Sequence, residues 1–328
     1  MNGAKIIDIL DIEGFLIGQA ENEQAGTGCT VVIAPKGATG GVDVRGGGPA
    51  TRETDLLDPV NMVESLHAVI LSGGSAYGLD AAGGVMRFLE EKNIGFPVGD
   101  MVVPIVSGAS LFDLIVGDGR IRPDMEMGYR SCLAAFAGEP LKEGNHGAGT
   151  GATVGKYMGM QRMMKSGIGH FALQAGDLRV GAIVAVNALG DILDCDSRRM
   201  LAGVLAADGR VLGDTCSCVL ENQDLKKNVF SGNTTIGCVL TNAKITKPQA
   251  NKLASVAQNG YADVIRPVHT MSDGDTVFVM SSGEVDADTL AVGILAREAV
   301  ARAINRAVFE AQSAYGLLSA SDFHSDVK

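Results

Sequence analysis

Short runs of apolar and β-branched residues recur along the chain, and most of them have glycine, aspartate or asparagine close by at one end or both. Runs of this kind, bounded by turn residues, are typical of β-strands. The pattern predicts strands at residues 30–33, 68–71, 102–106, 181–186, 210–212, 235–241 and 276–280.

Apolar residues three to four positions apart predict helices between several of these strands. The first covers residues 75–92, and the longest covers residues 286–315. Another begins at Thr246, with a proline near its first position, and stops at Gly260. No repeat or low-complexity linker divides the chain, so we expect a single domain over residues 1–328, with sheets covered by helices.

Composition narrows the classes of protein that this chain can belong to. Apolar residues make up 46% of it and the mean hydropathy is +0.18, which excludes a disordered protein. Its 44 glycines show no three-residue period and prolines number only 9, which excludes collagen. The net charge is −11 and the pI is near 4.9, so neither a nucleic acid nor an anionic membrane is the expected partner. A small molecule fits better.

The N-terminal segment carries acidic residues and lacks the apolar stretch of a secretory signal. The most apolar segment, residues 101–117, contains Pro104 and Asp113 and is too short to cross a bilayer. The cysteines are scattered, and the close pair Cys216 and Cys218 is expected on a strand without further metal ligands nearby. We therefore expect free thiols in a reducing cytoplasm, no metal and no cofactor.

Glycine-rich segments lie at residues 40–56, 71–84 and 143–156. None fits a phosphate-binding or dinucleotide-binding pattern, so tight turns and close backbone packing are the preferred interpretation. Ser75 follows two glycines but is not in a G-x-S-x-G elbow, and an N-cap is its expected role. The histidines form no zinc-binding pair.

The segment GNTTIGCVLTNA, residues 232–243, leaves three interpretations open. The first is a glycosylation acceptor at Asn233, which an intracellular chain would not use. The second is ordinary strand initiation, because Gly-Asn favours turns and threonine favours strands. The third is a self-cleaving bond, in which Thr234 attacks the carbonyl of Asn233 and becomes a new N-terminus. A free N-terminal threonine carries its own general base, an α-amine with an ordinary pKa of roughly 8.

Six segments together carry a family resemblance that spans nearly the whole chain. They are GGGPATRETDLL, LSGGSAYGLDAAGGVMRFLEE, RPDMEMGYRSC, GAGTGATVGK, GNTTIGCVLTN and RPVHTMSDGDTVF. The chain resembles the self-processing aminopeptidases that include the L-aminopeptidase/D-alanine esterase, the β-peptidyl aminopeptidases and the endo-type nylon-oligomer hydrolase. The resemblance implies an α+β fold, a four-layer αββα sandwich of the N-terminal-nucleophile type.

The resemblance also implies roles for individual residues. Thr234 matches the nucleophile and Asn233 the residue before the scissile bond, so cleavage would give an α piece of residues 1–233 and a β piece of residues 234–328. Asn187 matches an asparagine whose side-chain amide donates to the developing oxyanion. From the sequence alone, Asn187 is equally well a residue that ends a strand.

Lys156 matches a lysine of the nylon-hydrolase site, where a nearby ammonium would lower the pKa of the α-amine. Asp273 and Asp275 match an acidic pair that orients the amine and hydroxyl of the nucleophile, although Asp-Gly is also ordinary turn chemistry. Phe112 is the expected substrate-binding residue, at the position where the best-known members of the family carry a tyrosine.

These implications predict a self-processing aminopeptidase or amidohydrolase that acts on short peptides or related amides and esters, without a cofactor, and that forms a homo-oligomer of α/β pairs. Two alternatives are an acyltransferase of the ornithine-acetyltransferase type and a non-catalytic binding protein that has kept the fold. The sequence does not separate α-peptides, β-peptides, D-amino-acid amides and nylon oligomers as substrates.

Overall fold

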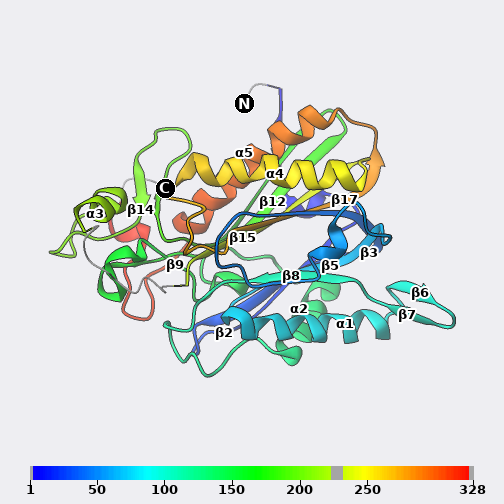
Figure 1. The fold of residues 1–328 in the computed structure, drawn as a ribbon, viewed down its shortest axis with the longest axis horizontal. Coiled ribbons are helices and arrows are strands. Elements are labelled where there is room, and N and C mark those ends of the chain that lie inside the picture. Colours follow the sequence, from blue (N-terminus) through cyan, green and yellow to red (C-terminus); the bar gives the residue numbers. More distant parts are fainter. Residues whose placement is uncertain (1–2, 223–231, 325–328) are drawn as a thin grey trace.

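The computed structural model describes residues 3–222 and 232–324. One continuous ten-stranded sheet folds over into two stacked layers, called here the first and the second sheet, and a pair of helices covers each outer face (Figure 1). The strand β3 (Thr27–Val44) runs through both sheets, and its pairing with β5 (Ser65–Ser72) is irregular between Ile33 and Ala38. Its first part pairs with β2 (Leu16–Asn22), and its last part pairs with β17 (Thr276–Val285).

The first sheet contains the last part of β3 and five further strands, in the order β17 (Thr276–Val285), β15 (Thr234–Ala243), β12 (Leu178–Asn187), β11 (Ile168–Ala175) and β1 (Lys5–Ile7). The second contains the first part of β3 with β2 (Leu16–Asn22), β5 (Ser65–Ser72), β8 (Val106–Ser110) and β4 (Thr51–Arg52). Most neighbours are antiparallel, whereas β15 with β17 and β5 with β8 are parallel.

Three apolar clusters fill the three interfaces between the four layers. One lies between the first sheet and the helices α4 (Lys247–Val264) and α5 (Thr289–Phe309), a second lies between the two sheets, and a third lies under α1 (Ala81–Glu91) and α2 (Met125–Ala137). Side chains of β12 alternate between the first two clusters: Val184 faces the helices, and Ile183 and Ala185 face the other sheet. The predicted αββα sandwich is confirmed.

The helix α4 begins where the sequence predicts and ends later. Thr246 and Gln249 form a capping box, and Pro248 lies in the first turn. The predicted stop at Gly260 is wrong, because α4 continues to Val264. A Cβ at Gly260 would lie 2.6 Å from the carbonyl oxygen of Arg297 in α5. Gly260 is therefore a helix-packing glycine and not a terminator.

Several local predictions are also wrong. Residues 75–92 form a 3-10 helix, Ser75–Asp80, followed by α1; Ser75 has φ 54 and is not the N-cap, which is Gly74. The run at residues 102–106 is split, because Pro104 separates β7 (Met101–Val103) from β8. Residues 210–212 lie in turns, apart from one bridge between Leu205 and Leu212.

Cys216 and Cys218 lie on a short helix, α3 (Thr215–Glu221), and not on a strand. Asp214 caps this helix by accepting a hydrogen bond from the backbone N–H of Ser217. The spacing of the two cysteines, on which the predicted strand rested, gives no sign of this cap. The six cysteines are free.

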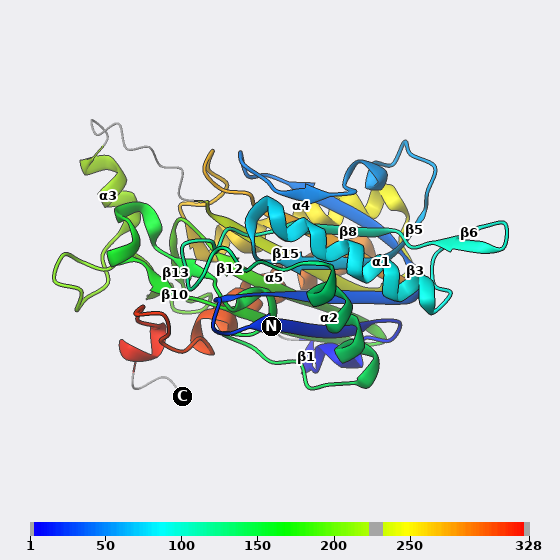
Figure 2. The ribbon, with the colours of Figure 1, turned by 90° about the horizontal axis from the view of Figure 1, so that it is seen from below.

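Three small antiparallel sheets complete the part of the chain that the structure describes. They are β6 (Phe96–Val98) with β7, β9 (Thr153–Val154) with β10 (Met164–Lys165), and β13 (Asp191–Leu193) between β14 (Met200–Ala202) and β16 (Ile265–Arg266). The last two sheets and α3 lie together at one end of the sandwich (Figure 2). Among residues 3–222 and 232–324, no helix has both the length and the apolar character that a membrane span requires.

Candidate active site

Strand pairing brings the candidate residues to one end of the first sheet. Asn187 is the last residue of β12 and lies opposite Thr234, the first residue of β15. Because β17 runs parallel to β15, its start lies beside the start of β15, and an isolated bridge joins Asn233 to Asp273. The two aspartates therefore precede β17 directly beside Thr234.

The Asn233–Thr234 peptide is buried, with Asn233 1% and Thr234 4% exposed. The hydroxyl of Thr234 donates a hydrogen bond to the carbonyl oxygen of Asn233. The same oxygen accepts the backbone N–H of Gly274 at 2.8 Å. A nucleophilic oxygen thus lies against the peptide carbonyl before it, and that carbonyl is polarised by a backbone donor.

Gly274 leaves room for this hydroxyl. A Cβ at position 274 would lie 2.8 Å from Oγ1 of Thr234 and 2.9 Å from the carbonyl oxygen of Gly48. Any other residue at position 274 would press on the threonine hydroxyl.

The side chain of Asn187 is fully buried and its amide is held at both ends. Its Oδ1 accepts the backbone N–H of Thr153 at 3.0 Å, which fixes Nδ2 as the donor end. Nδ2 donates to the carbonyl oxygen of Phe112 at 2.9 Å and to that of Gly232 at 3.4 Å. In the uncleaved chain, Asn187 therefore contacts the carbonyl one residue before the candidate scissile bond.

Lys156 reaches the same place from the glycine-rich segment that precedes it. Its buried Nζ donates to the carbonyl oxygen of Asn187 at 3.0 Å and to that of Gly232 at 3.3 Å. Burial lowers the pKa of the ammonium to about 7, against the opposing effect of the carboxylates of Asp273, Asp113 and Asp275. Near neutral pH this side chain can therefore exist with or without its proton.

Asp273 closes a tight turn. Its Oδ2 accepts the backbone N–H of Thr270 at 2.8 Å and the hydroxyl of Thr270 at 2.5 Å. Burial, and then the neighbouring charge of Asp275, raise the pKa of Asp273 to about 6.

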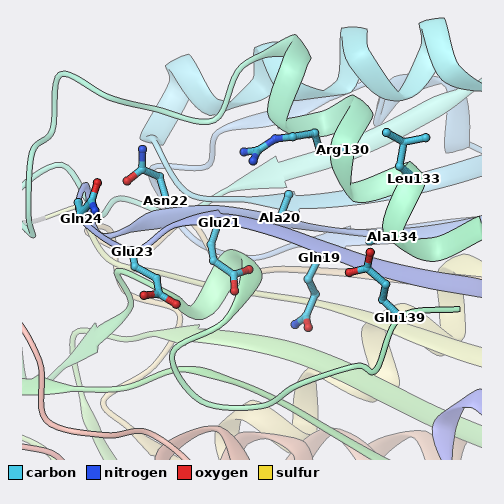
Figure 3. A pocket seen from close by; sticks show the side chains of 10 residues that line it. All are labelled: Gln19, Ala20, Glu21, Asn22, Glu23, Gln24, Arg130, Leu133, Ala134 and Glu139. Carbon is cyan, nitrogen blue, oxygen red and sulfur yellow. The ribbon is translucent and has the colours of Figure 1, made fainter. Parts of the chain in front are cut away.

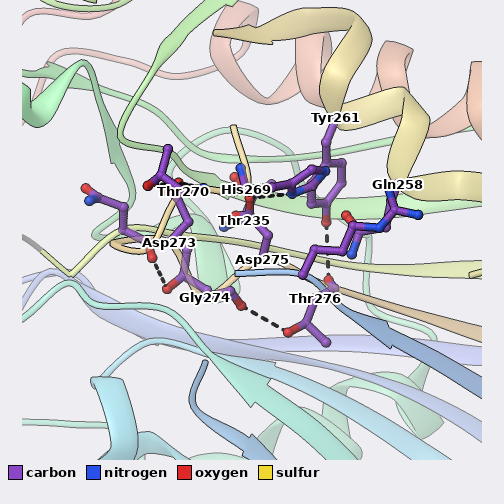
Figure 4. Close-up of polar contacts among 12 residues, drawn as sticks. Thr235, Gln258, Tyr261, His269, Thr270, Asp273, Gly274, Asp275 and Thr276 are labelled. Carbon is purple, nitrogen blue, oxygen red and sulfur yellow. Dashed lines mark hydrogen bonds and ion pairs between the residues drawn. The ribbon is translucent and has the colours of Figure 1, made fainter. Parts of the chain in front are cut away.

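Asp275 accepts hydrogen bonds on both carboxylate oxygens (Figure 4). Oδ1 accepts the backbone N–H of Thr235 at 2.8 Å. Oδ2 accepts the backbone N–H of His269 at 3.1 Å and lies 2.9 Å from Nδ1 of the same residue. The carboxylate is therefore bound to the residue that directly follows Thr234.

Known proteins are similar to this chain over most of its length. A family model described as peptidase family S58 matches residues 8–320. The chain belongs to peptidase family S58. An uncharacterized aminopeptidase of Mycobacterium leprae is 40% identical over 345 residues, which cover 96% of this chain and 93% of the relative. The 6-aminohexanoate-oligomer endohydrolase of a Kocuria species is 30% identical over 282 residues, covering 85% of this chain and 76% of the relative.

Solved structures support the fold assignment. The L-aminopeptidase D-Ala-esterase/amidase of Ochrobactrum anthropi, described as a variant of the Ntn hydrolase fold, aligns with a TM-score of 0.70 at 16% identity, over 97% of this chain and 92% of that one. A Burkholderia β-aminopeptidase aligns with a TM-score of 0.65 at 20% identity, over 95% and 89%. The resemblance stated from the sequence is confirmed, and the S58 chain is a hydrolase.

In this S58 chain, Phe112 packs against Gly232, which has φ +22. A Cβ on Gly232 would lie 2.1 Å from Cγ of the Phe112 ring. The ring therefore contacts the residue that precedes Asn233. Its neighbour Asp113 is buried and accepts from the hydroxyl of Thr27 at 2.6 Å and the backbone N–H of Gly74 at 2.7 Å, which anchors this loop.

The sequence did not single out Asp113 or His269 as site residues. His269 lies in the segment RPVHTMSDGDTVF, so its proximity to Asp273 and Asp275 was a usable signal. A lone histidine outside any metal-binding pair has no other local feature that marks it.

An open polar groove of about 660 Å³ lies elsewhere on the S58 chain, between β2 and α2 (Figure 3). Gln19, Glu21, Arg130 and Glu139 are among its lining residues. None of the residues around Thr234 lines it, so this groove is not part of the candidate active site.

Proposed function

We propose that this S58 chain cleaves its own Asn233–Thr234 peptide and then works as an aminopeptidase or amidohydrolase with Thr234 as N-terminal nucleophile. One observation carries the proposal: the buried hydroxyl of Thr234 is hydrogen-bonded to the carbonyl oxygen of Asn233, which also accepts the N–H of Gly274 at 2.8 Å.

In the self-cleavage step, Oγ1 of Thr234 attacks the carbonyl carbon of Asn233. The backbone N–H of Gly274 stabilises the negative charge that develops on the oxygen. The carbon–nitrogen bond breaks, the hydroxyl proton ends on the released α-amine, and an ester joins Asn233 to Thr234. Water then hydrolyses the ester, which restores the threonine hydroxyl and leaves Asn233 with a carboxylate.

In the hydrolase reaction, the free α-amine of Thr234 takes the hydroxyl proton as Oγ1 attacks the substrate carbonyl. Departure of the Gly232 carbonyl would free the amide of Asn187 to donate to the substrate oxyanion. Asp273 and Asp275 orient the nucleophile, and Lys156 adds positive charge that keeps the α-amine neutral. The acyl-enzyme is released by water.

Short peptides and related amides or esters are the proposed substrates. The names of the relatives support this class, since one is called an aminopeptidase and another a 6-aminohexanoate-oligomer endohydrolase. A screen of aminoacyl p-nitroanilides, β-amino-acid amides and 6-aminohexanoate oligomers would identify the preferred acyl group.

SDS gel electrophoresis with N-terminal sequencing tests the cleavage. We expect the 33.9 kDa chain to give two pieces, the smaller beginning at Thr234. Thr234→Ala should remain intact and inactive. Thr241→Val is the matched control, because Thr241 lies on the same strand and its hydroxyl contacts no site residue: it donates to the carbonyl of Arg179 at 3.0 Å and accepts the backbone N–H of Ala243 at 3.1 Å. An intact wild-type chain, or a first residue other than Thr234, would overturn the proposal.

We also propose that the two pieces remain associated and assemble further as a homo-oligomer in a reducing cytoplasm. The pairing of β15 with β12, from Thr234 opposite Asn187 to Thr241 opposite Val180, supports the association. Light scattering after gel filtration measures the assembly: a mass of one α/β pair would refute the oligomer, and separate pieces would refute the association.

A further inference from the structure

We propose that His269 is a positioning residue for Thr234, acting through Asp275. The inference rests on the proposed function, since it concerns the same nucleophile. His269 binds one oxygen of the Asp275 carboxylate, and the other oxygen binds the residue that follows Thr234.

Both donors of His269 are directed at Asp275. The backbone N–H lies 3.1 Å and Nδ1 lies 2.9 Å from Oδ2. A carboxylate only accepts, so Nδ1 carries the proton in this contact. With Oδ2 held twice, Oδ1 stays directed at the backbone N–H of Thr235, 2.8 Å away. The contact fixes the peptide on the C-terminal side of the nucleophile.

The imidazole is itself held in place. It stacks on the ring of Tyr261, with centroids 6.1 Å apart and an interplanar angle of 26° (Figure 4). Tyr261 is fully buried, and its hydroxyl donates to the carbonyl oxygen of Thr276, the first residue of β17, at 3.3 Å. Direct contacts therefore link the imidazole of His269 to the Asp275 carboxylate and, through Tyr261, to the start of β17.

Two unfavourable features of His269 support a specific role. Its φ is 56°, a left-handed conformation that is uncommon for residues other than glycine, although histidine and asparagine adopt it more often than most. Its Nε2 is buried and has no hydrogen-bond partner among the residues that the structure describes. The ring's polar contact is the one to Asp275, and strained, incompletely bonded groups of this kind concentrate at functional sites.

Two substitutions isolate the side-chain contact. His269→Gly removes the imidazole, tolerates the positive φ and keeps the backbone N–H that binds Asp275. His269→Asn returns a donor, because Asn Nδ2 occupies the place of His Nδ1 relative to Cβ, and asparagine also tolerates this φ. Both variants should therefore fold, which circular dichroism and thermal melting would check.

Self-cleavage is timed on gels after pulse-labelled cell-free synthesis, and kcat and KM are measured on the best aminoacyl p-nitroanilide. We expect His269→Gly to slow self-cleavage and kcat about 10- to 100-fold, with KM changed less than about twofold, because misplacement of a nucleophile acts on the chemical step. His269→Asn should recover both rates to within about threefold of wild type. Recovery by the amide separates a positioning contact from general packing.

A double substitution tests the route through Asp275. If His269 acts through that carboxylate, His269→Gly combined with Asp275→Asn should be no slower than Asp275→Asn alone. Additive losses would overturn the inference, as would a His269→Gly chain that processes and turns over at the wild-type rate, or an Asn variant that folds but recovers nothing. Thr234→Ala runs in parallel: if wild type and Thr234→Ala both stay intact, the proposed function itself has failed.

Discussion

The backbone N–H of Gly274 donates to the carbonyl oxygen of Asn233 at 2.8 Å, across the gap between two parallel strands. This contact places a donor on the carbonyl that Thr234 would attack, and the missing side chain at position 274 leaves space for the attacking hydroxyl.

Gly274→Ala should slow self-cleavage by at least about 100-fold, because the added methyl would lie 2.8 Å from Oγ1 of Thr234. Gly48→Ala is the control on the adjoining loop, since a Cβ there meets nothing closer than 3.8 Å. The self-cleavage of both variants is timed on gels. If Gly274→Ala is cleaved as fast as Gly48→Ala, the hydroxyl of Thr234 does not need this space.

Turnover should fall as the pH drops below neutrality. Asp273, whose pKa is raised to about 6, loses its charge below that value and then no longer helps to orient the nucleophile. A profile of kcat between about pH 5 and 9 measures this limb. Asp273→Asn should be slow, and its profile should lack the limb near pH 6; an unchanged limb would assign it to another group.

Lys165 makes a separate prediction about stability. Its buried Nζ donates to the carbonyl oxygens of Gly149, Ala152 and Ser166, and burial lowers its pKa from 10.5 to about 7. Between these values the unfolded chain binds more protons than the folded chain, so stability rises with pH. The rise is about 1.4 kcal/mol per pH unit for each such lysine.

Urea denaturation at about pH 7 and about pH 8 tests this relation, in a range where the thiols of the unfolded chain, with pKa values of about 8.5, mostly keep their protons. Lys165→Met should be less stable, because three carbonyls lose their donor, and its stability should rise less steeply with pH than that of wild type. Parallel pH dependences would show that Lys165 keeps its proton in the folded chain.

Gly260 and Gly293 offer a matched pair at the α4–α5 contact. Gly260→Ala should destabilise the chain by about 1–3 kcal/mol, because the new Cβ would lie 2.6 Å from a backbone oxygen. At Gly293 the nearest atom is 3.3 Å away and belongs to the side chain of Val256, so Gly293→Ala should be neutral or stabilising by up to about 1 kcal/mol. In thermal melts, the melting temperature of Gly260→Ala should fall below that of wild type, and that of Gly293→Ala should stay the same or rise.

The four-layer sandwich followed from the family resemblance, and most of the central strands followed from short apolar runs between turn residues, such as the one in β15. The capping residues of α4 are a local signal that predicted where that helix begins. The sequence did not reveal that β3 serves both sheets, that Gly260 packs against α5, or that His269 binds Asp275. The first two depend on contacts between distant segments, and a lone histidine has the same appearance in any loop.

The position of β15 has a consequence for the order of events. Under the proposed cleavage, residues 234–328 supply β15, β17, α4 and α5, whereas β11, β12 and β3 stay with residues 1–233. The first sheet, and the core between it and α4 and α5, need elements from both pieces, so the site around Thr234 could not form from either piece alone. The cut must then follow folding, and a severed Asn233–Thr234 bond would be a permanent chemical record that the molecule had reached its native state.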